Sequence, residues 1–541
     1  MCMVRGVSIT IVGLLLLSCF SSWNPVSSRG TPNIIDIDLP SDSTGTPGGT
    51  LAVRIYPPVE TRYSEGASII IYVPGADTPG GLRNFYQDKC RDMIVIYFLF
   101  PGGVDRFSGR VSDGVYDHRG LNCIKALRDV ILYAAGKLKD SMGRSIDEVV
   151  SVPILHDNIG LIGVSNGGNI VVAVAALYGE ELKGYLRYII QWESPVSSQI
   201  ATVDLGPIRH NCSPNNFVNP RYLGYNPMVL QVDYSDLCYD SSINLVFHDG
   251  NNDHHYTTVI DPRTGLPTPD LNLNGVLELD EDFPLSAYTD GVARFYSRPV
   301  THALLENNVF NGSWPRGIAS VEEADRYWDL REAVRLYDEA LRNIPDLRGM
   351  ILASIKDHVQ SAPDKPHIHQ AFDGWILNHG WVKINPDPEY IVEVDASLAG
   401  RSDLPMNKPD TPPRDWSNYD YCVPEDIPDT FYQIASIWEM SDRVYYNHWY
   451  TIDIASIEGG LGLTIKVKNL EDTTVSIPWS IRLDGGVVFG CREFSGVLDI
   501  SVGDEEEIKI NVIGFGYIDV EVRVDEVERS RGFLVLGLLF L

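Results

Sequence analysis

The sequence has few basic residues for its length, and this shortage limits the kinds of partner that it can bind. Its 541 residues contain 43 Lys and Arg against 73 Asp and Glu, a formal net charge of −30 at pH 7. Such a surface repels the phosphates of nucleic acids and of anionic membranes, so we expect neither as a partner. The acidic residues are spread along the chain, so the charge fits a soluble surface exposed to divalent cations and marks no site.

Long apolar runs are also scarce. The run Ile9–Ser18 after Arg5 has the length of a signal-peptide core and is too short for a stable transmembrane helix. We therefore expect residues 1–22 to be a signal peptide, with lipoprotein-type cleavage at Cys19 as the alternative, and a secreted or cell-surface protein. The apolar end, Phe533–Leu541, cannot span a bilayer, and we favour weak membrane or partner attachment over a buried terminal strand.

Cysteine is rare, with eight residues in the whole chain, and no two of them have CxxC spacing. Cys2 and Cys19 fall in or beside the predicted signal peptide, which leaves an even set in the mature chain. An even set in an exported protein suggests disulfides, and the local pair Cys212 and Cys238 is the first candidate. Buried free thiols are the alternative.

What the sequence does contain is an apolar strand, residues 158–164, that leads directly into a GxSxG motif. Ser165 is flanked by Gly163 and Gly167, and the apolar, helix-like stretch 170–177 follows. This strand, turn and helix is the pattern of a nucleophile elbow, which holds a serine strained and exposed above a sheet. The glycines leave room where backbones cross. The sequence therefore predicts a serine hydrolase with Ser165 as nucleophile, a plain glycine turn being the alternative.

Such a serine needs backbone amides that bind the developing oxyanion. The amide of Asn166 stands at the start of the following helix, where it would point at that charge. A second amide is expected in the glycine-rich loop Pro74–Gly81 after the strand Ala67–Val73, and we assign it to Ala76.

Apolar strands alternate with helical patterns from Ile34 onward, which predicts an α/β fold with a mostly parallel sheet covered on both faces. This order breaks at 197–318, which is rich in Asn, Asp, Pro and Gly and is interpreted as an inserted cap. Short alternating strands later in the chain predict an immunoglobulin-like all-β sandwich used for attachment or spacing. The expected units are a signal peptide at 1–22, a hydrolase-like core at 34–196 and 319–395, the cap at 197–318, a proline-rich connector at 396–440, the sandwich at 441–528 and an apolar tail at 529–541.

The region from about 34 to 395 resembles the α/β-hydrolase superfamily, and within it the esterase and prolyl-oligopeptidase-like branch. The resemblance rests on Gly163, Ser165, Gly167 and the order of the strands. It implies a triad of Ser, acid and His, in which His takes the serine proton and the acid fixes the imidazole tautomer. It also implies that the acid follows the seventh strand, where Asp357 stands after the strand Gly349–Ile355.

The histidine departs from the family pattern, since none closely follows the eighth strand at Trp381–Ile384. His358 is the leading base, and its acid would then be Glu193 or Asp249. Adjacent residues at a strand end point in opposite directions, which argues against Asp357 serving His358. His367, His369 and His379 are the other candidates. The predicted catalytic set is Ser165, Asp357 and His358.

Residues 270–281 fit the twelve-residue calcium-loop template. Asp270, Asn272 and Asn274 would supply side-chain oxygens, Val276 its carbonyl, and Glu281 a bidentate carboxylate. Pro267 and Pro269 exclude an entering helix, so the loop resembles an isolated dockerin-like site. We expect a structural Ca²⁺ ion that orders the cap. A weaker echo at Asp249–Asp253 could add a second calcium site, or His248, His254 and His255 could hold a transition metal.

Together these features predict an exported, calcium-stabilised serine hydrolase that cleaves small ester or peptide substrates through an acyl-enzyme on Ser165. The alternative is an inactive hydrolase-fold surface protein used for binding or assembly, because fold alone does not imply activity.

Overall fold

The computed structural model describes residues 34–540 with several gaps. The segments left out within this range are 84–89, 199–203, 206–217, 227–228, 257–258, 261–266, 269–279, 360–361, 363, 448, 450–451, 470–473, 490, 502–503, 525–526 and 538. The predicted signal peptide lies outside the described residues, as does most of the predicted calcium loop.

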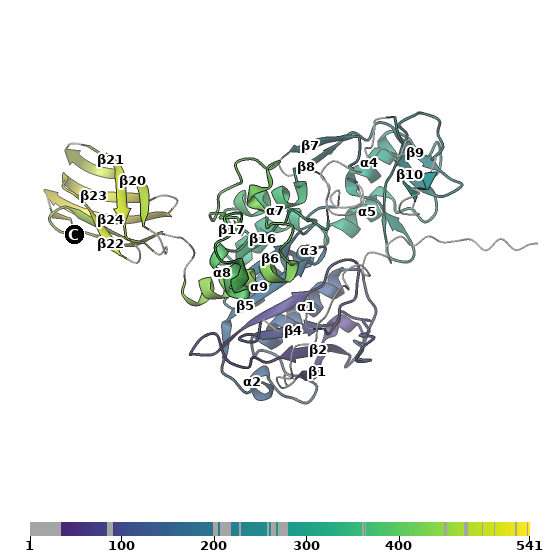
Figure 1. The fold of residues 1–541 in the computed structure, drawn as a ribbon, viewed down its shortest axis with the longest axis horizontal. Coiled ribbons are helices and arrows are strands. Elements are labelled where there is room, and N and C mark those ends of the chain that lie inside the picture. The colour runs from purple at the N-terminus through teal and green to yellow at the C-terminus, as the bar shows by residue number, and fades with distance from the viewer. Residues whose placement is uncertain are drawn as a thin grey trace, which may run out of the picture.

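The centre of the molecule is an eight-stranded sheet of order β1-β2-β4-β3-β5-β6-β16-β17 (Figure 1). Its strands are β1 (Ile35–Pro40), β2 (Thr50–Tyr56), β3 (Ala67–Val73), β4 (Ile94–Phe98), β5 (Ile154–Val164), β6 (Leu186–Trp192), β16 (Arg348–Leu352) and β17 (Trp381–Ile384). β2 runs antiparallel to β1 and β4, and the remaining neighbours run parallel. This large mixed sheet with its helices fits the α/β-hydrolase arrangement.

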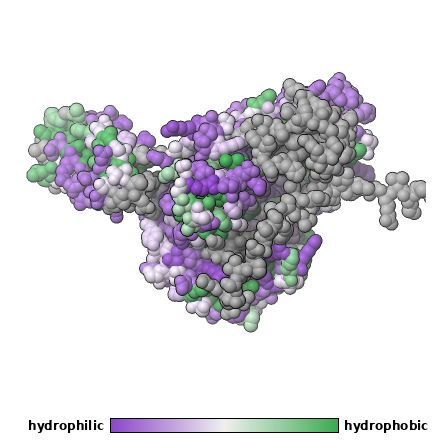
Figure 2. Space-filling view, in the orientation of Figure 1, coloured by the Kyte–Doolittle hydropathy of each residue, from purple (hydrophilic) through white to green (hydrophobic). Residues whose placement is uncertain are grey.

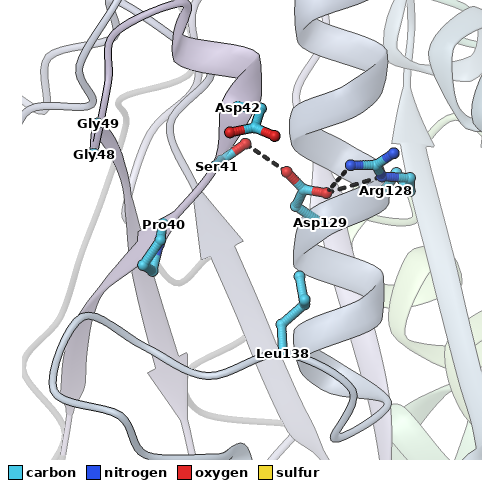
Figure 3. A pocket seen from close by; sticks show the side chains of 8 residues that line it. All are labelled: Pro40, Ser41, Asp42, Gly48, Gly49, Arg128, Asp129 and Leu138. Atoms are coloured by element: carbon cyan, nitrogen blue, oxygen red, sulfur yellow. Dashed lines mark hydrogen bonds and ion pairs between the residues drawn. The ribbon is translucent and has the colours of Figure 1, made fainter.

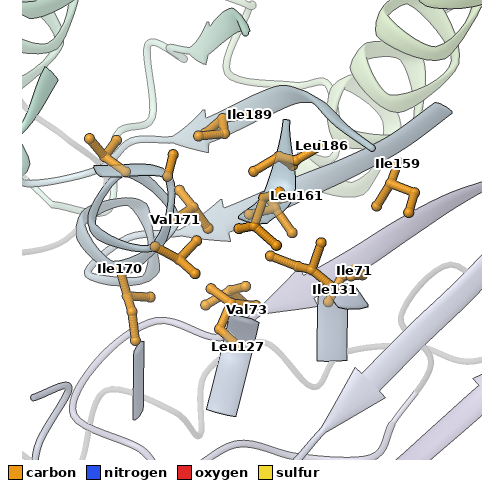
Figure 4. Close-up of a cluster of buried hydrophobic side chains, with 14 of the residues drawn as sticks. Ile71, Val73, Leu127, Ile131, Ile159, Leu161, Ile170, Val171, Leu186 and Ile189 are labelled. Carbon is orange, nitrogen blue, oxygen red and sulfur yellow. The ribbon is translucent and has the colours of Figure 1, made fainter. Parts of the chain in front are cut away.

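Helices cover both faces of the sheet. They are α1 (Leu121–Ala134), α2 (Ile146–Val149), α3 (Gly167–Leu182), α6 (Tyr337–Asn343), α7 (Pro366–Ile376), α8 (Pro388–Val394) and α9 (Asp429–Tyr445), while α4 (Arg298–Glu306) and α5 (Val321–Trp328) pack with the inserted segment. Side chains of α1, α3, α6 and α7 pack on one face, and Figure 4 shows Leu127 of α1 and Ile170 of α3 in the same buried cluster as Leu161 of β5. α8 and α9 pack on the other face, against Ile162 and Ile190. Successive strand residues thus enter opposite cores, which explains why the central strands are apolar throughout.

The segment 396–440, expected as a connector, is instead part of the second core. The amide of Ile355 donates to the carbonyl of Val423 at 2.9 Å, and α9 lies against β5, β6 and β16. Tyr432 and Ile437 of α9 are fully buried. Pro405, Pro409 and Pro424 of this segment are themselves buried, so these prolines do not mark a flexible link.

Between β6 and β16 the chain forms a separate group of short strands with its own small core. These strands are β7 (Tyr222–Asn226), β8 (Val229–Val232), β9 (Leu237–Asp240), β10 (Leu245–His248), β11 (Val259–Ile260), β12 (Pro267–Thr268), β13 (Phe283–Pro284), β14 (Tyr288–Thr289) and β15 (Arg294–Phe295). Val246, Phe283 and Val300 lie at the centre of that core. None of these strands joins the main sheet, as expected for an insertion.

The C-terminal part is a strand-rich unit that Figure 1 shows beside the main body. Its strands are β18 (Ile452–Glu458), β19 (Leu463–Asn469), β20 (Val475–Phe489), β21 (Glu493–Ile500), β22 (Glu505–Ile510), β23 (Ile513–Val524), β24 (Val527–Gly537) and β25 (Leu539–Phe540). They form a three-stranded and a five-stranded sheet around one shared core. An immunoglobulin-like topology for this unit remains a prediction.

The apolar end of the chain belongs to that unit. β24 pairs with β23 along its length, and Phe533 and Val535 are buried in the shared core. Leu534 and Leu536, which alternate with them, are exposed. Figure 2 shows hydrophobic residues on the surface of this unit. The residues expected as a separate tail therefore form a strand with one buried and one exposed face.

The expected disulfides do not form in the described part of the chain. Cys90, Cys123, Cys238, Cys422 and Cys491 are free thiols there, so the suggested pairing of Cys238 is wrong, while Cys212 lies outside the described residues. Cys90, Cys123 and Cys422 are buried among apolar side chains and act as small core residues.

None of the helices described here is long and apolar enough to cross a membrane.

Leu161 tests how much the central sheet depends on this packing. It is fully buried between α1 and α3, so Leu161→Ala should lower the free energy of unfolding by about 2–5 kcal/mol. Calorimetric unfolding of both proteins measures the change. Leu377→Ala, at an exposed helix end, is the matched control and should change little. Equal losses in the two variants would contradict the assigned core.

Candidate active site

Ser165 lies on the tight turn between β5 and α3. Its φ is +49°, in the left-handed region that a non-glycine residue adopts only under constraint. The turn is held by a hydrogen bond from the Ser165 amide to the carbonyl of Trp192 at 2.9 Å and by one from the Gly168 amide to the Ser165 carbonyl at 2.9 Å. The chain thus forms the strand, turn and helix expected of a nucleophile elbow.

Glycine is required around this turn because backbones approach closely. A Cβ on Gly163 would lie 2.7 Å from the carbonyl oxygen of Gly167, and a Cβ on Gly167 would lie 2.5 Å from that of Val73. A Cβ on Gly75, in the loop after β3, would come within 2.9 Å of the Ser165 Cβ. The loop after β3 therefore lies directly beside the serine.

Glu193 stands at the same edge of the sheet as Ser165. Trp192, the last residue of β6, pairs with Val164 of β5 and with Leu352 of β16. The residues that follow these three therefore emerge side by side. Glu193 adopts φ +42°, and its amide donates to the Leu352 carbonyl at 3.0 Å.

Glu193 binds His358 through two contacts. Its Oε2 lies within hydrogen-bond distance of the imidazole Nδ1 and accepts the His358 amide at 3.0 Å. Its Oε1 accepts from Ser354 Oγ and, at 3.3 Å, from the Tyr432 hydroxyl. Because an ionised carboxylate accepts and does not donate, Nδ1 carries the proton and Nε2 is left as the basic nitrogen.

The exposure of the two side chains differs in the way that a base and its orienting acid require. The Glu193 side chain is 1% exposed, whereas that of His358 is 38% exposed. Burial by itself lowers the pKa of His358, but the hydrogen bond and charge of Glu193 outweigh it, so the pKa lies above its ordinary value. The Trp192 ring, 4.7 Å from that of His358, packs on the imidazole and connects it to the strand end that also holds Ser165.

Asp357, predicted as the acid, makes different contacts. It is fully buried, accepts the Val359 amide at 2.7 Å, and lies 2.8 Å from His367 Nε2 and 3.6 Å from Lys365 Nζ. Burial raises the pKa of Asp357, but the neighbouring charges of His367 and Lys365 hold it well below the usual range. The structure therefore pairs His358 with Glu193 by direct hydrogen bonds. Asp357 lies close by, with a carboxylate oxygen within 4.8 Å of both, but its own partners are His367 and Lys365.

The other three candidate histidines make contacts elsewhere in the fold. His367 is buried against Asp357. His369 stacks on Trp416, with ring centroids 4.0 Å apart, and burial lowers its pKa to about 4. His379 lies before β17, at the edge of the sheet opposite to Ser165.

The predicted oxyanion donors are the backbone amides of Ala76 and Asn166. The carbonyl of each of these two peptide groups already accepts a hydrogen bond. Arg119 Nη2 donates to the carbonyls of Pro74, Gly75 and Thr78 at 2.7, 3.2 and 3.1 Å. Because the C=O and N–H of one trans peptide point in opposite directions, the Ala76 amide is turned away from Arg119. The Ser165 carbonyl faces α3 in the same way, which turns the Asn166 amide out of the helix. Within the described part of the chain, neither amide is assigned a hydrogen-bond acceptor.

Sequence reasoning named Glu193 only as an alternative and missed Ser354, Tyr432 and Arg119. The one usable signal for Glu193 was its position directly after an apolar strand. Tyr432 lies on α9, 239 residues from Glu193 along the chain, and no local pattern joins the two.

The predicted calcium ligands Asp270, Asn272, Asn274 and Val276 lie outside the described residues, and Glu281 is buried.

A separate hollow of about 220 Å³ lies between the end of β1 and α1 and is lined by Ser41 and Asp129 (Figure 3). It contains none of the candidate site residues, so it is not the substrate site of Ser165.

No model of a known family matches the chain, and no curated protein matches it. Solved structures similar to part of the chain include a hyperthermophilic esterase from the archaeon Pyrobaculum calidifontis, at 16% identity and TM-score 0.21 over 31% of this chain and 45% of that one. A Penicillium α/β-hydrolase matches at 15% identity and TM-score 0.20 over 31% and 47%, and a metagenomic carboxylesterase at 15% and 0.21 over 31% and 50%. The matched part thus spans half or less of each of these proteins. Likenesses this partial say nothing about what this chain acts on.

Glu193→Gln tests the pairing with His358 directly. The variant retains a hydrogen-bonding side chain but removes the charge that raises the imidazole pKa, so the pKa of His358 should fall. A pH titration of the imidazole C–H signals by NMR, assigned with His358→Gln, measures it. Asp373→Asn, which faces His369, is the control and should leave His358 unchanged. An unchanged pKa in Glu193→Gln would show that Glu193 does not set the state of His358.

Proposed function

We propose that the protein is a serine hydrolase that cleaves ester or peptide bonds through an acyl-enzyme on Ser165, with His358 as base and Glu193 as its orienting acid. The observation that carries the proposal is the contact between Glu193 and His358 at the sheet edge where strained Ser165 stands. This contact provides a base even though no histidine closely follows the eighth strand. The order Ser, Glu, His along the chain is that of α/β-hydrolase triads.

In this mechanism His358 Nε2 accepts the proton of Ser165 Oγ while Oγ bonds to the substrate carbonyl carbon. The carbonyl oxygen becomes an oxyanion, stabilised by the amides of Asn166 and Ala76. The intermediate collapses, and the leaving alcohol or amine takes the proton from His358. Water then repeats the sequence on the acyl-enzyme, which releases the acid and restores Ser165.

Glu193 has the environment that this role requires. It is buried, yet the imidazole, the His358 amide and the Ser354 and Tyr432 hydroxyls all face it. These donors fix the position of the carboxylate, which orients the imidazole through Nδ1 and can stabilise the imidazolium that forms as the serine proton moves.

We further propose that the protein acts outside the cytoplasm and that calcium stabilises its insertion. The location rests on the predicted signal peptide alone. For calcium, the described residues offer buried carboxylates at Glu281 and Asp282. A Cβ on Gly250 would lie 2.5 Å from the Glu281 carbonyl oxygen, so the predicted loop ends against Asp249–Asp253. A cation here would offset the cost of burying these charges.

A fluorophosphonate probe, which reacts with activated serines, tests the proposed activity. Labelling located by peptide mass analysis should be confined to Ser165 and absent in Ser165→Ala, with Ser313→Ala as the control for an exposed serine. His358→Gln should slow labelling by about 10³-fold or more, because the serine loses its base.

Glu193→Gln should slow the same labelling more than Asp357→Asn does, with the folding of each variant checked by circular dichroism. The reverse order would restore Asp357 as the acid. A folded, calcium-loaded protein without any labelling would instead favour an inactive scaffold used for binding.

Calcium is tested by thermal unfolding in the presence of a calcium-selective chelator. Removal of the ion should lower the melting temperature, since a ligand at a hundred times its Kd stabilises the native state by about 2.7 kcal/mol. Glu281→Gln should reduce the change in melting temperature on chelation, whereas Glu322→Gln, at an exposed position on α5, should retain that change. An identical melting temperature with and without calcium would contradict the proposal.

A further inference from the structure

A cysteine, an aspartate and a histidine of the inserted segment meet beside the β9–β10 hairpin. One ligand atom from each of Cys238, Asp249 and His254 lies within 4.8 Å of the other two. Cys238 Sγ is 3.9 Å from His254 Nδ1, and that nitrogen is 3.2 Å from Asp249 Oδ2. We propose that these residues bind a borderline transition-metal cation, with zinc as the best fit.

The hairpin itself brings two of the ligands together. Cys238 of β9 pairs with Phe247 of β10, and Asp249 lies two residues beyond Phe247. Opposed residues of an antiparallel pair share a face, and so do residues two apart, so Cys238 and Asp249 are diagonal neighbours on one face. The Asp249 amide donates to the Asp236 carbonyl at 3.1 Å, which extends the pairing past β10.

The loop after β10 returns His254 to the same point. Asp249 accepts the amides of Asp253 and His254, each at 3.1 Å. The His254 side chain is 72% exposed, whereas that of Asp249 is 4% exposed. The imidazole can therefore move to close the site, and a coordination position stays open to solvent or to a fourth ligand.

The distances suit a tetrahedral zinc shell. With Zn–S near 2.3 Å and Zn–N and Zn–O near 2.1 Å, neighbouring ligand atoms lie about 3.3–3.6 Å apart. The observed separations of 3.2 and 3.9 Å bracket this range, and both involve the exposed His254 imidazole, whose rotation can adjust them. Thiolate and imidazole ligands favour zinc over calcium, which takes oxygen ligands.

The surroundings are electronegative, as a cation site requires. The carboxylates of Asp240, Asp249 and Asp282 all lie near Cys238, and their negative charge would attract a cation. None of the three ligands belongs to the candidate active site, so the inference is independent of the proposed catalytic function.

The test uses the full-length, tag-free protein, reduced and freed of metal, and titrated with Co²⁺ as a spectroscopic probe. We expect a thiolate-to-cobalt charge-transfer band that saturates at one equivalent and is displaced by one equivalent of Zn²⁺. Cys238→Ser should abolish the band. His254→Gln should weaken binding by at least the roughly 10–100-fold that loss of an outer-shell partner costs.

His255→Ala, at the adjacent exposed histidine, and Cys491→Ser, at an exposed thiol in the C-terminal unit, are the controls and should retain the band. Glu281→Gln should also retain it, which separates this site from the calcium loop. Persistence of the band in Cys238→Ser, its loss in Cys491→Ser, or the absence of stoichiometric binding in folded wild-type protein would overturn the proposal.

Discussion

Three neighbouring strands end in register, and the candidate site depends on this pairing more than on any other feature. Val164, Trp192 and Leu352 are paired across β5, β6 and β16, so the chain leaves all three strands at one level. Ser165 and Glu193 are the first residues beyond, and His358 follows in the loop after β16. A slip of one residue in β6 would turn Glu193 to the other face of the sheet and remove it from His358.

The same pairing explains the strain at the strand ends. Ser165 and Glu193 each adopt positive φ directly after the last paired residue, a conformation that costs on the order of 1–3 kcal/mol for a non-glycine residue. Hydrogen bonds from their amides to Trp192 and Leu352 hold them there, and the helices on both faces fix the strands. The stability of the sheet thus supports a local geometry that its end residues would not adopt alone.

How much the sequence could predict follows from the range of each interaction. The elbow was predictable because its strand, glycines and helix are contiguous, and the sheet because each central strand is apolar throughout. Glu193 and His358 meet only through the register of β6 and β16, which no local pattern encodes. The packing of segment 396–440 was missed for a similar reason. Its prolines are typical of a linker, and α9 packs on strands that lie far earlier in the chain. The prediction of disulfides was wrong because an even number of cysteines does not show that any two of them lie close enough to bond.

The two buried carboxylates near His358 differ in what neutralises them, and this difference decides between them. Asp357 has the Lys365 cation and the His367 imidazole as partners, so its charge is already offset within the core. Glu193 accepts hydrogen bonds from neutral hydroxyl and amide donors and from the imidazole, while the more distant Lys365 interacts with it through charge alone. When His358 takes a proton from Ser165, the new positive charge is therefore compensated chiefly by Glu193. An acid already paired with lysine could orient the ring but would stabilise the imidazolium less, so the cluster around Asp357 leaves the catalytic charge to Glu193.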